Sequence, residues 1–385
     1  MKRSLIFLWL IIITMVIPSK TLPGAQREDV LGDDIDAIIA RAESGDAEAQ
    51  MELGQMYRFG AGVAQNSGVA VEWYRKAAEQ GKVECQVYIG YMYLTGENGL
   101  GKNAAKAEEW FIKAAESGHP DAQTTLGRMY INGNGVEKNP EAALYWYQKA
   151  AEQGYVPALL GIGKAYAGAS GFEKDRAKAE EWLMKAAEQD YAPAQLEIGR
   201  LYATGENVFV KDPAKAEEWY IKAAGNGYAI AHVYLSGMYA TGDGVPQDTE
   251  RANDLMLKAA EQGNTLAQME MGRIYATGDG VHEDIERSDY WYEKAAENGD
   301  AYMKFVLAMR YEDGDGVEKN VEKAMELYVQ AAEAGSFYAQ FALAQRYASG
   351  DGVEKDAGKA HFWLEKAADQ GYLPAQQEID GAYTG

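Results

Sequence analysis

The amino-acid sequence predicts an all-α protein, an α/α superhelical solenoid of about nine and a half helix-turn-helix repeats. Three observations predict it: a tyrosine recurs every 36 or 37 residues, an Asn or Asp suited to capping a helix recurs with it, and glycines stand where each helix would end. A chain of 385 residues also exceeds the usual size of one compact core, which favours a repetitive architecture.

The recurring tyrosine marks the first helix of each repeat. Each first helix carries a small residue, an aliphatic residue four positions later, a glycine directly after it, and the tyrosine three positions beyond the glycine. Ala49, Leu53, Gly54 and Tyr57 are one example. These offsets place the residues on one helical face. We expect the glycine to let a neighbouring helix approach, with the ring of the tyrosine filling the space beside it. The tyrosines are Tyr57, Tyr93, Tyr130, Tyr166, Tyr202, Tyr239, Tyr275, Tyr311, Tyr347 and Tyr383.

The second helix is framed by a cap and a closing glycine. A glycine-rich turn such as Gly60–Val63 precedes the cap, Trp or Leu stands seven residues after it, and a glycine (Asp190 in one repeat) stands eight residues further on. The two repeats with an additional residue carry it between tyrosine and cap, where a loop tolerates insertion. The caps are Asn66, Asn103, Asn139, Asp175, Asp212, Asp248, Asp284, Asn320 and Asp356.

These units resemble Sel1-like repeats, relatives of tetratricopeptide repeats, over residues 46–385. The departures are local: Leu255 and Leu327 replace Trp, and Ser236, Ala308 and Ala344 replace the glycine. The resemblance implies a superhelical solenoid whose first helices line the inner surface. It also implies roles such as envelope assembly, signalling adaptors or contact with a host.

The N-terminus differs from the repeats. Lys2 and Arg3 precede an apolar run from Leu5 to Ile17, a pattern typical of a secretory signal and too short for a membrane span. Residues 1–25 are therefore predicted to be a signal peptide, with an uncleaved anchor as the alternative. Residues 26–45 form a lead-in segment with a helix from Asp34 to Glu43, and residues 46–385 form the solenoid. This organisation predicts an exported protein, periplasmic or secreted.

The net charge of −22 makes nucleic acid and anionic lipid unfavourable partners, since both are bound mainly through Lys and Arg. Membrane contact is expected only through the N-terminal segment, if it stays uncleaved. The expected partner is a protein or peptide, and the chain itself is expected to be a monomer. A single cysteine leaves stability to packing.

No residue pattern predicts catalysis, a cofactor or a metal. His119, His232, His282 and His361 stand in separate repeats, and the Asp-Gly turns near Asp313 lack the spacing of a calcium loop. Cys85 occupies the small-residue position of its helix and is expected to be a buried thiol. Some Sel1-like proteins form a cysteine-rich branch linked to β-lactams, but its paired cysteines are missing here, as is a Ser-x-x-Lys motif.

The first helices carry a candidate binding surface. The residue after the glycine is basic in four repeats (Arg128, Lys164, Arg200 and Arg273) and is Tyr91 in another. The position four earlier is apolar except at Thr124 and includes Phe305 and Phe341. Two interpretations stay open: a groove for an acidic, partly hydrophobic peptide, or ordinary repeat sequence in which the arginines pair with Glu of the next unit and the apolar row is partly core. On the opposite side, Glu and Lys four residues apart, as in Glu181 and Lys185, indicate a solvated surface.

The sequence thus predicts a non-enzymatic protein-interaction scaffold of the bacterial envelope or secreted space, with its partner on the concave face. The alternatives are a protein that binds or hydrolyses cell-wall glycan or β-lactams, and a purely structural spacer.

Overall fold

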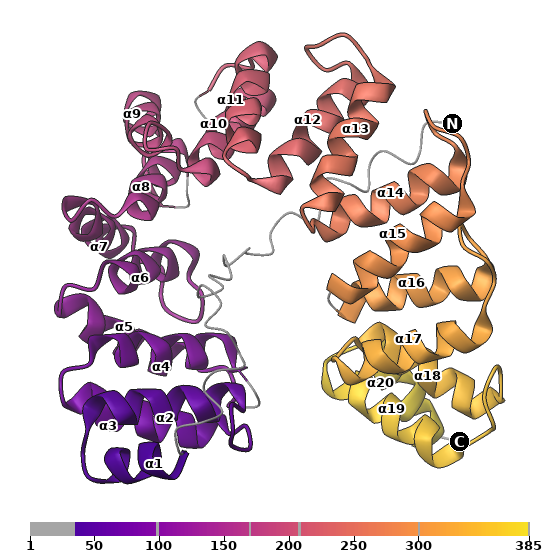
Figure 1. The fold of residues 1–385 in the computed structure, drawn as a ribbon, viewed down its shortest axis with the longest axis horizontal. Coiled ribbons are helices and arrows are strands. Elements are labelled where there is room, and N and C mark those ends of the chain that lie inside the picture. The colour runs from indigo at the N-terminus through magenta and orange to yellow at the C-terminus, as the bar shows by residue number, and fades with distance from the viewer. Residues whose placement is uncertain (1–34, 98–99, 169–170, 207–208, 299–300, 384–385) are drawn as a thin grey trace. The chain divides into compact units, whose positions relative to one another are not determined.

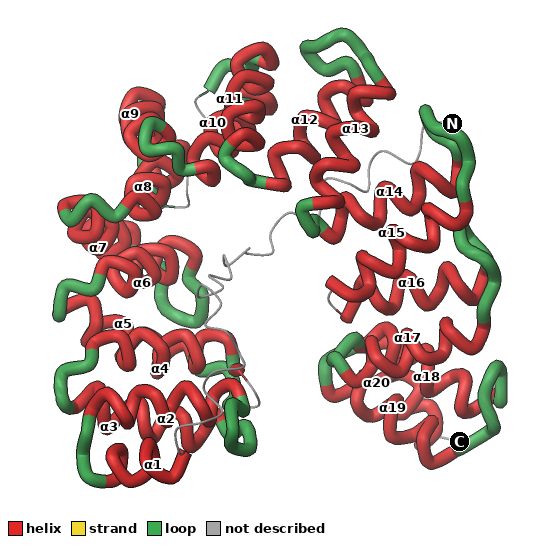
Figure 2. Tube along the Cα trace, in the orientation of Figure 1, coloured by secondary structure: helices red, strands yellow, loops and turns green. Residues whose placement is uncertain are grey.

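A computed structural model describes residues 35–97, 100–168, 171–206, 209–298 and 301–383 (Figure 1). The predicted signal segment 1–25 and residues 26–34 of the lead-in lie outside this range. Within it the chain is helical throughout, with no strand (Figure 2). None of the described helices combines the length and the apolar character that crossing a membrane requires.

The described residues form twenty helices, joined by short turns, and this confirms the predicted all-α solenoid of helix-turn-helix repeats. The helices are α1 (Ile35–Glu43), α2 (Ala47–Phe59), α3 (Ser67–Glu79), α4 (Val83–Thr95), α5 (Ala104–Glu116), α6 (Pro120–Asn132), α7 (Pro140–Glu152), α8 (Val156–Gly168), α9 (Arg176–Ala187), α10 (Ala192–Thr204), α11 (Pro213–Gly225), α12 (Ala229–Thr241), α13 (Thr249–Glu261), α14 (Thr265–Thr277), α15 (Ile285–Asn298), α16 (Ala301–Asp313), α17 (Val321–Glu333), α18 (Phe337–Ser349), α19 (Ala357–Asp369) and α20 (Leu373–Tyr383). The predicted lead-in helix is α1, and the even-numbered helices from α2 onward are the predicted first helices.

The predicted caps are confirmed in all nine repeats. In the first, Asn66 Oδ1 accepts a hydrogen bond from the backbone N–H of Val69 at 3.0 Å, and Asp284 does the same for Arg287 at 3.0 Å. The backbone N–H of each cap also donates to the carbonyl oxygen of the recurring tyrosine, at 2.8 Å between Asn66 and Tyr57. The longer second and fifth repeats keep this bond, so their inserted residue leaves the joint between the helices unchanged.

The role expected for the recurring tyrosine ring is corrected by the structure. The ring that lies against the glycine belongs to the second helix: a Cβ added at Gly54 would lie 2.6 Å from Tyr74, and one at Gly272 would lie 2.6 Å from Tyr292. The glycine therefore does allow a close helix–helix approach, as expected. In seven of the repeats the recurring tyrosine lies instead beneath a Lys or Arg three residues after the cap, as Tyr239 does beneath Arg251 at 4.0 Å.

The second helices end on left-handed residues, as predicted. Gly81 and Gly154 have φ of 94° and 75°, and Asp190 takes the same role at 55°. The glycines of the Asp-Gly turns are also left-handed, with φ of 76° at Gly314. Gly299 lies outside the described residues.

The chain divides into two compact units. The first extends to Ala122 and includes Asn134–Val136, and the second comprises Gln123–Gly133 and the residues from Glu137 onward. In the first unit, Tyr74, Ile89 and Met92 pack with Cys85, which is fully buried as predicted. Burial raises the pKa of the Cys85 thiol to about 12. In the second unit, Tyr292, Leu307 and Tyr328 belong to one core cluster.

Candidate protein-binding face

The first helices present one side on which the predicted site residues lie. We define the first-helix face by three positions of each of these helices: six before, three before and one after the repeat glycine or its replacement. In α16 these are Tyr302, Phe305 and Met309, and in α18 they are Tyr338, Phe341 and Gln345. Spacings of three, four and seven residues place them on one side of a helix.

Two of the predicted basic residues meet at one buried carboxylate. Arg200 Nη2 lies 2.8 Å from Glu197 Oε1, and Lys164 Nζ lies 3.7 Å from Glu197 Oε2. Arg200 also pairs with Glu206 at 2.7 Å. Burial of Glu197 disfavours its ionised form, but the neighbouring Lys164 and Arg200 outweigh it, so that the pKa of this carboxyl lies below its ordinary value.

The other predicted residues have varied surroundings. Arg273 on α14 pairs with Glu270 at 2.6 Å and with Asp279 at 3.3 Å. Arg128 is half-buried on α6. In the first unit, Tyr91 Oη donates to Asp121 at 2.9 Å, and its ring lies edge-on to Phe111 at 5.0 Å.

The basic row is therefore largely engaged within the chain. The ion pair between Lys164 and Glu197 joins two successive repeats, as one interpretation of the sequence expected. Arg200 and Arg273, in contrast, pair with a glutamate three residues earlier on their own helix. An acidic peptide would have to compete with these carboxylates. Binding of a partner by this row stays a prediction.

The predicted aromatic residues stand in a larger aromatic group. Phe305 stacks on Tyr338 with ring centroids 5.6 Å apart and 22° between the planes. Tyr302 lies 5.8 Å from Tyr338, and Phe341 lies 5.3 Å from Tyr372 in the turn before α20. Tyr302 and Tyr338 keep 43% and 40% of their surface exposed, so rings on this side face solvent.

Sequence reasoning missed Tyr302 and Tyr338. The signal was present, because each tyrosine stands three residues before one of the predicted phenylalanines and so shares its helical side. The signal was hidden because the position of these tyrosines, six residues before the repeat glycine, holds a different type of residue in other repeats, such as Glu48, Pro157 or Leu266.

The second helices expose a different surface. Lysine ammonium groups lie over tryptophan rings, at 3.7 Å for Lys76 on Trp73 and 4.3 Å for Lys185 on Trp182. Lys185 also makes the predicted ion pair with Glu181, at 2.6 Å. Exposed aromatic residues here, such as Tyr145 and Tyr290, each pack on the tryptophan that follows them. This side therefore offers single rings that already contact their own helix.

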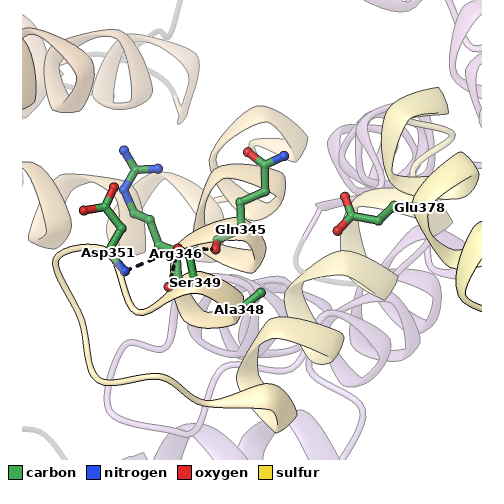
Figure 3. Close-up of a pocket in the computed structure, with 6 residues that line it drawn as sticks. All are labelled: Gln345, Arg346, Ala348, Ser349, Asp351 and Glu378. Atoms are coloured by element: carbon green, nitrogen blue, oxygen red, sulfur yellow. Dashed lines mark hydrogen bonds between the residues drawn. The ribbon is translucent and has the colours of Figure 1, made fainter.

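An open pocket of about 530 Å³ adjoins the end of the first-helix face. Figure 3 shows the side chain of Glu378 on α20 directed toward Gln345 on α18, with Arg346 and Asp351 on the other side. Ser349 Oγ donates to the carbonyl oxygen of Gln345 at 2.9 Å, so its hydroxyl is held by its own helix. Among the described residues, no group of three or more His, Cys, Asp and Glu could hold a metal ion.

Comparisons with known proteins agree with the repeat geometry. The Sel1 repeat family matches nine consecutive segments from residue 47 to residue 372: residues 47–82, 83–119, 120–155, 156–191, 192–228, 229–264, 265–300, 301–336 and 337–372. No curated protein sequence matches the chain significantly.

Two solved structures share the fold at substantial sequence identity. A protective antigen present in uropathogenic Escherichia coli strains, displaying an SLR fold, is 33% identical over 91% of this chain and 82% of its own, with a TM-score of 0.51. A Sel1 repeat protein from Oxalobacter formigenes is 32% identical over 82% of this chain and 92% of its own, with a TM-score of 0.53. With nine matched repeats and helix pairs of the same kind, the chain belongs to the Sel1 repeat family.

Proposed function

We propose that this chain is a non-enzymatic scaffold of the bacterial envelope or secreted space that binds a protein partner along its first-helix face. Sel1 repeat proteins are generally protein-interaction scaffolds and generally non-catalytic. For this particular chain, we propose in addition where it is located, which face binds, and that it binds a partner.

The exposed aromatic group on α16 and α18 is the observation that carries the choice of face. Rings from two successive first helices and from the turn before α20 contact one another while two of them remain substantially exposed. Connected aromatic surface of this kind is typical of binding sites, whereas scattered exposed rings are normal on any protein. The exposed rings of the second helices are scattered in this way.

The proposed location rests on the N-terminal sequence. A basic start followed by a short apolar run is typical of exported proteins. Similarity to a protein described as a protective antigen of a bacterium supports the same proposal.

Capture of partners from envelope extract and culture medium tests this function. The purified chain would be compared with two variants, Arg128→Glu combined with Lys164→Glu, and Tyr302→Ser combined with Tyr338→Ser. The matched control is Tyr145→Ser combined with Tyr290→Ser on the second helices. We expect a saturable partner that is lost in at least one first-helix variant and retained in the control. A partner lost only in the control would contradict the proposed face, and the absence of any saturable partner would favour a structural spacer.

A further inference from the structure

We propose that the C-terminal end of the first-helix face binds a basic, partly apolar peptide segment of a protein partner. The inference rests on the proposed function, because it names the place and the chemistry of binding on the same face. Its site, called here the aromatic surface, is formed by Tyr302, Phe305, Phe337, Tyr338, Phe341 and Tyr372.

Tyr338 is the centre of the aromatic surface. Its ring contacts Phe337 at 4.3 Å and Tyr372 at 5.5 Å, in addition to Tyr302 and Phe305. It nevertheless exposes 40% of its surface. Contacts with four other rings restrain Tyr338, so a ligand that contacts its exposed part finds the ring preorganised, and the entropy cost of binding is reduced.

The charges at the other end of α18 are negative and uncompensated. The pocket at Gln345, one helical turn after Phe341, carries the carboxylates of Asp351 and Glu378. Neither carboxylate makes an ion pair within the described residues. Arg346, the one cation among the described residues that line this pocket, is held by the carboxylate of Glu312. On α10 and α14, by contrast, Glu197 and Glu270 are neutralised by Arg200 and Arg273.

These features select a basic occupant. Cations are attracted both to unpaired carboxylates and to the electron-rich faces of Tyr and Phe. An acidic peptide would be repelled here, in a chain whose net charge is already −22. The apolar part of the ligand is accommodated by the rings together with Met309 and Leu373, which are 39% and 60% exposed.

The test uses labelled peptides of about twelve residues, a length that spans two successive first helices. One alternates Lys or Arg with Leu or Phe, a second has Glu in place of every basic residue, and a third has Ser in place of every apolar residue. Binding to the purified chain is measured by fluorescence anisotropy. The variants are Tyr338→Ser, Tyr302→Ser, and Asp351→Asn combined with Glu378→Gln.

Matched controls lie on second helices of the same unit. Tyr290→Ser removes a ring that is 51% exposed on α15, and Glu326→Gln removes an exposed carboxylate on α17. Thermal melting of each variant verifies folding, and Tyr302→Ser keeps the test valid if Tyr338→Ser fails to fold.

We expect the basic apolar peptide to bind more tightly than the other two, and to lose about tenfold in affinity with Tyr338→Ser or Tyr302→Ser and severalfold with the double charge variant. The two controls should leave its affinity unchanged. Equal or tighter binding of the acidic peptide, or affinity indifferent to both tyrosine variants, would overturn the inference. So would a change in sedimentation of the free chain with Tyr338→Ser, which would identify a second copy as the occupant.

The outcomes also separate this inference from the proposed function. If partner capture depends on Arg128 and Lys164 while the basic peptide does not bind, the function stands and the inference fails. If the peptide binds as expected but no partner is captured by any form of the chain, the proposed function fails as a description of a natural interaction.

Discussion

Gln370 donates a hydrogen bond from its Nε2 to Oε1 of Gln340, across 2.7 Å. Gln340 in turn donates from its Nε2 to the carbonyl oxygen of Ala332 at 3.0 Å. One buried carboxamide on α18 thereby links the C-terminal ends of α17 and α19. Gln50 and Gln195 make the equivalent bonds, with Gln80 and Asn226 as the donors.

Replacing this carboxamide should destabilise the solenoid. Gln340→Leu keeps the approximate volume but removes both side-chain hydrogen bonds, the one to the carbonyl of Ala332 and the one from Gln370, while the carbonyl of Ala332 keeps the backbone N–H of Gly335 at 3.0 Å. We expect a loss of about 1–3 kcal/mol in the free energy of unfolding, because two hydrogen bonds are lost and each contributes about 0.5–1.5 kcal/mol. Urea denaturation followed by circular dichroism measures it.

The control for this substitution is Gln330→Leu at an exposed position of α17. It should change the free energy of unfolding by less than about 0.5 kcal/mol. Equal effects of the two substitutions would contradict a structural role of the Gln340 bonds. Leu159 naturally replaces the glutamine in its own repeat, so the fold tolerates the loss of one such link.

Gly272→Ala should also destabilise the protein. The new methyl group would lie 2.6 Å from a ring carbon of Tyr292, which is fully buried and has no room to withdraw. Overpacking of this kind costs about 1–3 kcal/mol. Gly237→Ala on α12 is the matched control, because a Cβ there meets nothing within 4 Å. It should stabilise the helix by up to about 1 kcal/mol through higher helix propensity. A destabilisation by both alanines would show that close packing at Gly272 is not the cause.

Asp190→Gly should stabilise the chain. Among the described residues Asp190 is the only one other than glycine with a positive φ, at 55°, and the equivalent position is glycine in the neighbouring repeats. Glycine adopts this conformation without steric cost, so we expect a gain of about 1 kcal/mol. The reverse substitution, Gly227→Asp in the next repeat, should cost a similar amount. Thermal melting of both variants checks the prediction, and a loss of stability on Asp190→Gly would contradict it.

The elements of the fold were predictable from the sequence because the same sequence signals occur in each repeat. Each cap, each closing glycine and each helix face recurs at a fixed interval, so local signals reinforce one another. The ring against Gly54 was wrongly assigned because Tyr57 follows this glycine by three residues on the same helix, whereas Tyr74 comes from the second helix. Only the packing of α2 on α3 shows that Tyr74 is the one that approaches.

The candidate site was less predictable, since it depends on deviations from the repeat. The sequence identified Arg200 and Phe305 by comparing repeats at one position. It could not show that Arg200 is engaged by Glu197 and Glu206, nor that Phe305 stacks on Tyr338 of the next first helix. Contacts between neighbouring repeats decide both, and these contacts follow from the geometry of helix stacking.

The pairing of Glu197 makes a pH-dependent contribution to stability. Its pKa is lowered in the folded protein by Lys164 and Arg200, against the effect of burial. The ionised form is therefore favoured by folding, and the stabilisation is present above the unfolded-state pKa of about 4.3. It is lost as the pH falls through the lower folded-state pKa, because the protonated carboxyl no longer attracts the two cations.

Glu197→Gln should accordingly cost about 2 kcal/mol at pH 7, where the wild-type carboxylate is charged, and less at pH 3.5. Urea denaturation at the two pH values measures the difference between the wild-type chain and the variant. Glu218→Gln on the exposed side of α11 is the control and should cost little at either pH, since exposed carboxylates contribute less than about 1 kcal/mol. A cost of Glu197→Gln that is the same at both pH values would mean that packing of the side chain, and not its charge, accounts for its contribution to stability.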